Sequence, residues 1–132
     1  LDRLRDLIMK EMRADKWAAE NIIRYIRVQM DFLRYLGIDS FHSPENLIIE
    51  RYIDRGYGVK YIIFHTVFGR RVNNVLARAY AYAAREYLGV SVKILIDDHA
   101  FALEYPVSYN LDIIKLLESV NSGNIRELVS KA

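Results

Sequence analysis

Two consecutive arginines, Arg70 and Arg71, follow Gly69 at the point where an apolar run gives way to a helical pattern. Guanidinium groups donate paired hydrogen bonds to phosphate, and the free N–H groups of a helix N-terminus favour an anion at the same place. Without an anion, cations beside the positive end of a helix dipole are unfavourable by roughly 0.3–1 kcal/mol. The junction therefore predicts a phosphate contact. Two solvated arginines, or an arginine paired with a nearby carboxylate, fit the same residues equally well.

The basic character continues beyond this junction. Residues 70–93 carry five basic side chains against Glu86 alone, whereas residues 94–132 carry three basic and six acidic side chains. Although the whole chain has a net charge of only +2, a basic central segment favours a polyanionic partner. Asn73 could donate to a phosphate or cap the helix. The predicted nucleic-acid-binding residues are Arg70, Arg71, Asn73, Arg78, Arg85 and Lys93.

A second constellation could bind a divalent metal. Asp97, Asp98 and His99 are consecutive, and His65 or Glu50 could add a ligand, as in a metal-dependent nuclease. Adjacent carboxylates in a strand point to opposite faces, and in a tight turn they commonly accept hydrogen bonds from the backbone. The turn role is therefore the favoured interpretation. His65 lies in the middle of a predicted strand, where we expect a half-buried core histidine.

Several kinds of catalytic site are missing. None of the six glycines is followed by lysine, so there is no G-x-x-x-x-G-K-[ST] phosphate loop. The chain has no cysteine, and no serine lies in a G-x-S-x-G elbow. We therefore predict no catalytic residue, no metal site and no cofactor in this chain. Ten tyrosines and Trp17 could stack on bases, but most are expected in the core, above all Tyr80 and Tyr87.

The elements that must position these residues indicate an α+β fold. Residues 71–88 place apolar side chains three and four apart, which is typical of a helix packed on a sheet. This apolar stripe consists of Val72, Leu76, Tyr80, Ala83 and Tyr87. Residues 61–68 are apolar, β-branched or aromatic, the pattern of a strand buried on both faces. The predicted strands are residues 47–53, 59–68, 90–96 and about 101–105, in two hairpins around one helix, and the flanking helices are residues 1–12, 16–36, 111–120 and 124–131.

The predicted fold is thus a small, largely antiparallel sheet in a ββαββ core with flanking N- and C-terminal helices. By length, residues 1–132 form a single accessory domain, with a helical lead-in over 1–37, the core over 46–105 and C-terminal helices over 110–132. Because the first residue is Leu1 rather than methionine, we expect a fragment of a longer protein. No apolar run approaches the roughly 18 residues of a membrane span, and we expect a cytoplasmic protein with no membrane partner.

Three segments resemble a known family. They are E-R-Y at Glu50–Tyr52, V-K-Y-I-I-F-H-T-V-F-G-R-R-V-N-N-V-L-A-R-A at Val59–Ala79, and D-D-H-A-F at Asp97–Phe101. Together they resemble the Lhr (large helicase-related) family, in its DEAD/H-associated region downstream of the two helicase motor domains. The resemblance is best over Leu47–Tyr105, and its most specific part is F-G-R-R-V-N. Ala100 departs from the family pattern, which usually has glycine in that turn.

The resemblance implies an ATP-dependent DEAD/H-type helicase as the parent protein. Its motor and winged-helix domains would lie upstream in the same chain, and the motor domains would use ATP and magnesium. This chain would then be a nucleic-acid-binding accessory domain that holds the strand, with DNA expected rather than RNA. A structural clamp that packs on the motor domains and touches little nucleic acid is an alternative, and a metal-dependent nuclease is another.

Overall fold

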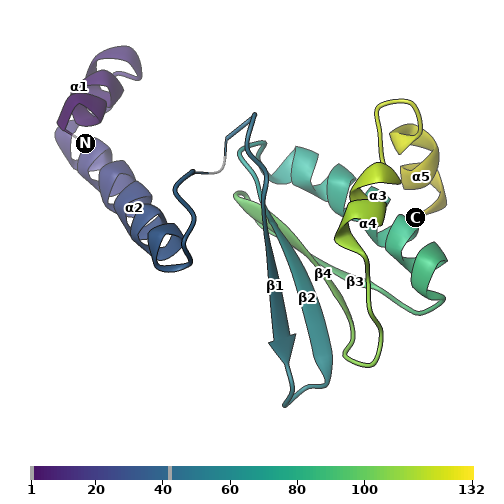
Figure 1. Cartoon of the computed structure of the whole chain (residues 1–132). Coiled ribbons are helices and arrows are strands. Elements are labelled where there is room, and N and C mark those ends of the chain that lie inside the picture. The colour runs from purple at the N-terminus through teal and green to yellow at the C-terminus, as the bar shows by residue number, and fades with distance from the viewer. Residues whose placement is uncertain (1, 42) are drawn as a thin grey trace. The chain divides into compact units, whose positions relative to one another are not determined.

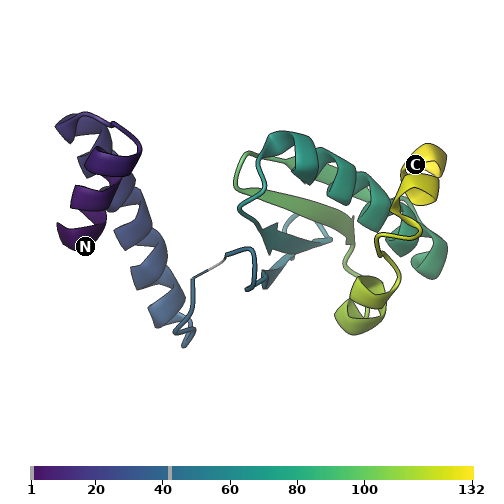
Figure 2. The same cartoon turned by 90° about the horizontal axis from the view of Figure 1, so that it is seen from above.

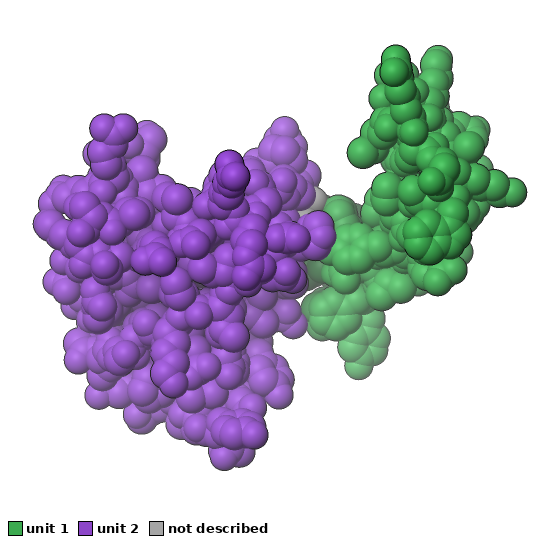
Figure 3. All heavy atoms as spheres, turned by 180° about the vertical axis from the view of Figure 1, so that it is seen from behind, with its two compact units in different colours: residues 1–41 green, residues 42–132 purple. Residues whose placement is uncertain are grey.

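The computed structural model describes residues 2–41 and 43–132. Leu1 and His42, which the sequence places in the first helix and in a connecting loop, lie outside the described residues. The chain forms two compact units, residues 1–41 and residues 42–132 (Figure 3). The first unit contains the expected helical lead-in. The assignment of the whole chain to a single accessory domain stays a prediction.

The first unit is a pair of helices, α1 (Asp2–Glu11) and α2 (Lys16–Tyr35), shown in Figure 1. Asp15 caps α2, because its carboxylate accepts a hydrogen bond from the Ala18 amide at 2.7 Å. Ile8 of α1 packs against Ala19 and Ile23 of α2, and all three are buried. This cluster is small, so polar contacts matter for the pairing.

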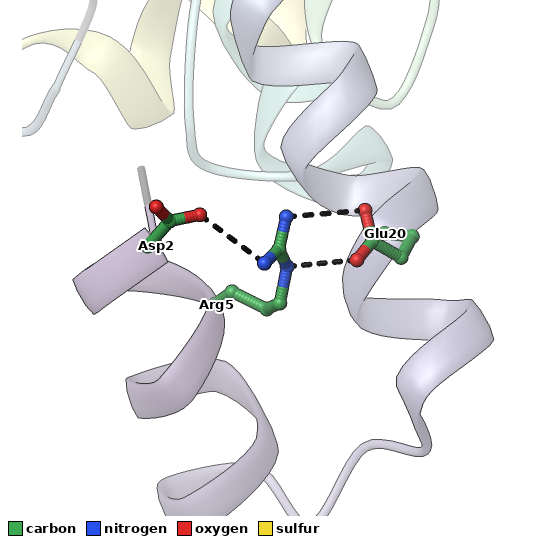
Figure 4. Close-up of polar contacts among 3 residues, drawn as sticks. All are labelled: Asp2, Arg5 and Glu20. Atoms are coloured by element: carbon green, nitrogen blue, oxygen red, sulfur yellow. Dashed lines mark hydrogen bonds and ion pairs between the residues drawn. The ribbon is translucent and has the colours of Figure 1, made fainter.

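Arg5 supplies those polar contacts (Figure 4). Its Nε lies 2.8 Å from Glu20 Oε1 on α2, and its Nη1 lies 3.1 Å from Asp2 Oδ1 on its own helix. A guanidinium held between two carboxylates in this way orders α1 against α2. Glu20 of α2 therefore forms its ion pair with α1.

The second unit carries a four-stranded antiparallel sheet. Its elements are β1 (Ile48–Asp54), β2 (Val59–His65), α3 (Arg70–Leu88), β3 (Lys93–Ile96), β4 (Ala100–Pro106), α4 (Ile113–Glu118) and α5 (Ile125–Lys131). The strand order is β1-β2-β4-β3, so the two hairpins join through β2 and β4. The α+β fold and the ββαββ core are confirmed. None of the described helices has the length and hydropathy needed to cross a membrane.

Helices α3 and α4 contribute side chains to the core on one face of the sheet, and α5 lies beside α3 (Figure 2). Ile62 and Phe64 of β2 meet Phe101 and Leu103 of β4 there, and every one of the four is at most 2% exposed. The Phe64 ring stacks on Phe101, with centroids 4.5 Å apart, and on Tyr80 of α3 at 5.1 Å. Burial in this core raises the pKa of Tyr80.

The predicted apolar stripe of α3 is wrong at two of its residues. Leu76 and Tyr80 pack on the core as expected, but Val72 is 45% exposed and Tyr87 is 53% exposed. Asn73, Ala77 and Ala84 are the fully buried residues at the centre of the sheet-facing side. The stripe is thus rotated by about one residue. Small side chains occupy its centre because they let α3 approach the sheet closely.

The interpretation of β2 as a strand buried on both faces is wrong for this unit. Its buried residues alternate, with Ile62 and Phe64 under α3 and Tyr61, Ile63 and His65 only partly covered. Apolar side chains on the second face made the run look doubly buried. Within residues 43–132, no helix covers that second face, which we call the open face.

The packing of α3 gives a paired test. Leu76→Ala should lower the free energy of unfolding by about 1–3 kcal/mol, less than the ~2–5 kcal/mol of a fully buried leucine, since Leu76 is partly buried on the core. Val75→Ala, at the adjacent 42% exposed position, should cost less than about 0.5 kcal/mol. Urea unfolding measures both. Equal losses of stability would mean that α3 is rotated from the orientation described here.

Candidate nucleic-acid interface

The link from β2 to α3 is short and depends on Gly69. This residue is the N-cap of α3 and has φ 82° and ψ 168°, a conformation essentially restricted to glycine. Its carbonyl accepts the first helical hydrogen bond from the Asn73 amide at 3.0 Å. The first turn of α3 contains no acidic residue and receives no side-chain cap among the described residues. The helix therefore begins with amide groups open to an anion.

Asn73 is not available to a ligand in this structure. It is completely buried, and its Oδ1 accepts a hydrogen bond from the Thr66 hydroxyl at 2.6 Å. Its Nδ2 donates to the carbonyl oxygens of Asp97 at 2.9 Å and Asp98 at 3.3 Å. We call these hydrogen bonds the Asn73 network. They join the start of α3 to the end of β2 and to the β3–β4 turn, so the side chain neither caps the helix nor faces solvent.

Three of the predicted arginines lie along one side of α3. Arg71, Arg78 and Arg85 are spaced by seven residues, two helical turns, and all three are exposed. Successive arginines are therefore separated by roughly 10 Å along the helix axis. We call them the arginine row. Within residues 43–132, no carboxylate forms an ion pair with any of the three. The row thus has charge available for a partner.

An aromatic residue, Tyr82, lies beside the arginine row, and its place there was not predicted from the sequence. The Arg85 guanidinium lies over the Tyr82 ring, 5.2 Å from its centroid. Arg78 Nε donates to Asn74 Oδ1 at 2.7 Å. A hollow of about 140 Å³ between α3 and β3 is lined by Arg78, Tyr82 and Arg85 together with apolar residues. The spacing of Tyr82, four after Arg78 and three before Arg85, is the signal that could have identified it.

Arg70 and Lys93 do not join this row. Arg70 is exposed at the first position of α3, about 100° around the helix from Arg71. Lys93 pairs with Glu104 across β3 and β4, so it belongs to the open face of the sheet, and its Nζ lies 3.7 Å from Glu104 Oε1. The five cations predicted to bind nucleic acid therefore divide between two faces of the unit, with four on α3 and Lys93 on the open face.

The acidic residues considered for metal binding serve other contacts. Asp97 Oδ1 accepts from the Asp98 amide at 2.7 Å, which is the turn role favoured by the sequence. His65 Nε2 lies 3.2 Å from Glu50 Oε1 in the neighbouring strand, and His65 is half-buried. Among residues 2–41 and 43–132, no three histidine or acidic side chains are grouped closely enough to hold a metal ion.

Comparison with known proteins matches this architecture to one family. The family model described as DEAD/H associated covers residues 42–132, which is the whole second unit. The chain belongs to the DEAD/H associated family. The Lhr resemblance is confirmed by curated relatives. The chain is 33% identical over 95% of its length to the ATP-dependent helicase Lhr-Core of Saccharolobus solfataricus, and 31% identical over 99% to that of Methanothermobacter thermautotrophicus.

A solved structure shows the same fold. The Mycobacterium smegmatis helicase Lhr, bound to ssDNA and AMP-PNP, matches 98% of this chain with a TM-score of 0.67 and 24% sequence identity. The chain spans 14% of the length of each of the two curated relatives and 15% of that solved chain. The DEAD/H associated unit is therefore a small part of each protein that it matches.

The F-G-R-R-V-N motif of this DEAD/H associated unit now has a physical explanation. Gly69 has the backbone angles with which the chain passes from the β2–α3 link into the helix, and Asn73 forms the Asn73 network one helical turn later. Arg70 and Arg71 lie between them at the exposed start of α3. The motif thus contains two residues that fix the local structure and two arginines that are exposed.

The adjacent residues Asn73 and Asn74 provide a matched test of the Asn73 network. Asn73→Ala leaves the Thr66 hydroxyl and two carbonyl groups without this partner, so the free energy of unfolding should fall by at least about 1–3 kcal/mol. Asn74→Ala removes only the hydrogen bond to Arg78 and should change stability by less than about 0.5 kcal/mol. Thermal and urea unfolding measure both variants. Two equally mild effects would contradict the structural role of Asn73.

Proposed function

We propose that this chain is a nucleic-acid-binding accessory module of an ATP-dependent, Lhr-type DNA helicase. The curated relatives are named ATP-dependent helicases, and the Mycobacterium smegmatis relative was solved with ssDNA. ATP and magnesium would act on motor domains elsewhere in the same polypeptide, next to a winged-helix domain. The expected nucleic acid is DNA, and the expected location is the cytoplasm.

The observation that carries the proposal is the arginine row. Arg71, Arg78 and Arg85 point away from the core along about 20 Å of α3, where no described carboxylate pairs with them. A row of guanidinium groups at this spacing can follow a phosphate backbone and release its counterions. The open amides at the start of α3 lie at one end of the row and add a further anion contact, with Arg70 beside them.

The neighbouring Tyr82 suggests how the strand would lie. A base could stack on its ring once the Arg85 guanidinium moves from the ring to an adjacent phosphate, with Arg78 holding another, since aromatic rings accept any base. Contacts of this kind position a strand without reading its sequence. Such a module would hold single-stranded DNA while the motor domains turn over ATP.

The structural clamp remains the second candidate because a specific feature favours it. The open face carries apolar side chains on the side of the sheet opposite α3. Apolar side chains do not bind phosphate, but they can pack against another protein surface. The two functions are compatible, because the arginine row and the open face are separate surfaces of one unit.

A salt titration tests the arginine row. Arg71→Ala combined with Arg78→Ala should weaken binding of the 132-residue chain to single-stranded DNA, similarly for two oligonucleotides of unrelated sequence. The slope of log K against log salt should flatten by about 0.7 for each phosphate that the variant no longer neutralises. Thermal melts should stay close to wild type, because both side chains are exposed.

Lys93→Ala is the matched control, since it also removes an exposed cation but from the open face. It should leave the salt slope unchanged. Identical slopes for the double variant and wild type would refute phosphate binding by the row. An equally large effect of Lys93→Ala would show that only total charge matters.

A further inference from the structure

The open face of the sheet combines apolar and acidic side chains. The antiparallel registers place alternate residues of each strand on it, with Tyr52 opposite Tyr61, Ile63 opposite Ala102, and Leu95 opposite Ala102. The Tyr52 and Tyr61 rings stack, with centroids 6.1 Å apart. These side chains line a groove of about 530 Å³, and its lining is mostly apolar.

The groove is unusual for a surface that only meets water. Tyr52 is 53% exposed and Leu95 is 50% exposed, and they flank the partly buried Tyr61 and Ile63 of β2. A contiguous apolar patch on a small unit commonly marks a binding surface. This composition also explains why β2 has the sequence of a strand buried on both faces: it has the apolar side chains for a second covered face.

Acidic side chains lie beside these apolar residues. The registers put Glu50, Asp54 and Glu104 on the open face, and Lys93 is the cation that the strands place there with them. Lys93 is already paired with Glu104 at 3.7 Å, and His65 contacts Glu50 at 3.2 Å. Asp97 also lines the groove. The open face is therefore acidic, in contrast to the basic side of α3.

These charges decide between two occupants of the groove. Stacked tyrosines on an antiparallel sheet could hold the bases of a single strand. The phosphates of that strand would then lie against Glu50, Asp54 and Glu104, where like charges repel them. A protein segment with apolar and basic side chains meets no such penalty and gains ion pairs with these carboxylates.

We propose that the open face is a docking site for a basic amphipathic helix. The apolar side of the helix fills the groove over Tyr61, Ile63 and Leu95, and its lysines or arginines meet Glu50, Asp54 and Glu104. Because this chain spans 14% of each of two curated relatives, most of a relative's length is available to supply such a helix. The proposal stands independently of nucleic-acid binding by the arginine row.

A displayed library of helical peptides tests the chemistry of the site. Peptides of about 16 residues, roughly 24 Å of helix, would be selected on the 132-residue chain. We expect the enriched peptides to carry an apolar stripe and a positive net charge. Their affinity should fall about tenfold or more for Leu95→Ser, since a side chain at the centre of the contact is truncated. Tyr52→Ser serves the same purpose if Leu95→Ser does not fold.

Val75→Ser is the matched control, because Val75 is 42% exposed on the outer side of α3. It should leave peptide affinity unchanged, and Leu95→Ser should leave the affinity for a single-stranded oligo-dT unchanged. Three results would overturn the proposal: no enrichment, enriched peptides without positive charge, or equal binding to wild type and Leu95→Ser. Weaker binding of oligo-dT to Leu95→Ser than to wild type would assign the open face to nucleic acid instead.

Discussion

The hydrogen bonds of the buried Asn73 side chain fix how α3 lies on the sheet. They reach the Thr66 hydroxyl at the end of β2 and two carbonyl groups of the β3–β4 turn, so one amide group connects three elements. Buried polar groups without partners are costly, and this network leaves little freedom for α3 to rotate. With Asn73 facing inward, Arg71, Arg78 and Arg85 must face outward. The basic surface is therefore a consequence of a buried contact.

The same arrangement gives the second unit two different faces. On one side of the sheet, α3 presents cations and open helix amides, which suit a polyanion. On the other side, β1, β2 and β4 present stacked tyrosines, aliphatic side chains and carboxylates, which suit a protein. In the longer polypeptide that we propose, such a unit could hold DNA with one face and attach to a neighbouring helix with the other.

Sequence periodicity predicted which elements form, because each has a clear pattern. Two strand boundaries were wrong, since β2 ends at His65 and β3 begins at Lys93, so both are shorter than the predicted residues 59–68 and 90–96. Asp15 and Gly69 mark helix starts, and every expected strand exists. Burial was harder to predict. The sequence does not show whether a helix covers an apolar side chain on β2. Asn73 was predicted to contact phosphate because its buried hydrogen-bond partners are distant in sequence. Lys93 was grouped with the arginines by charge alone, although strand register places it on the opposite face.

We propose that single-stranded DNA meets the α3 side of this unit and not the open face. Nuclear magnetic resonance of the labelled 132-residue chain, titrated with oligo-dT, tests it most directly. We expect the Nε–H signals of Arg71, Arg78 and Arg85 to shift together with the first amides of α3, while the amides of Ile63, Leu95 and Ala102 stay in place. Shifts concentrated on those open-face residues, with the arginine signals unchanged, would contradict the account.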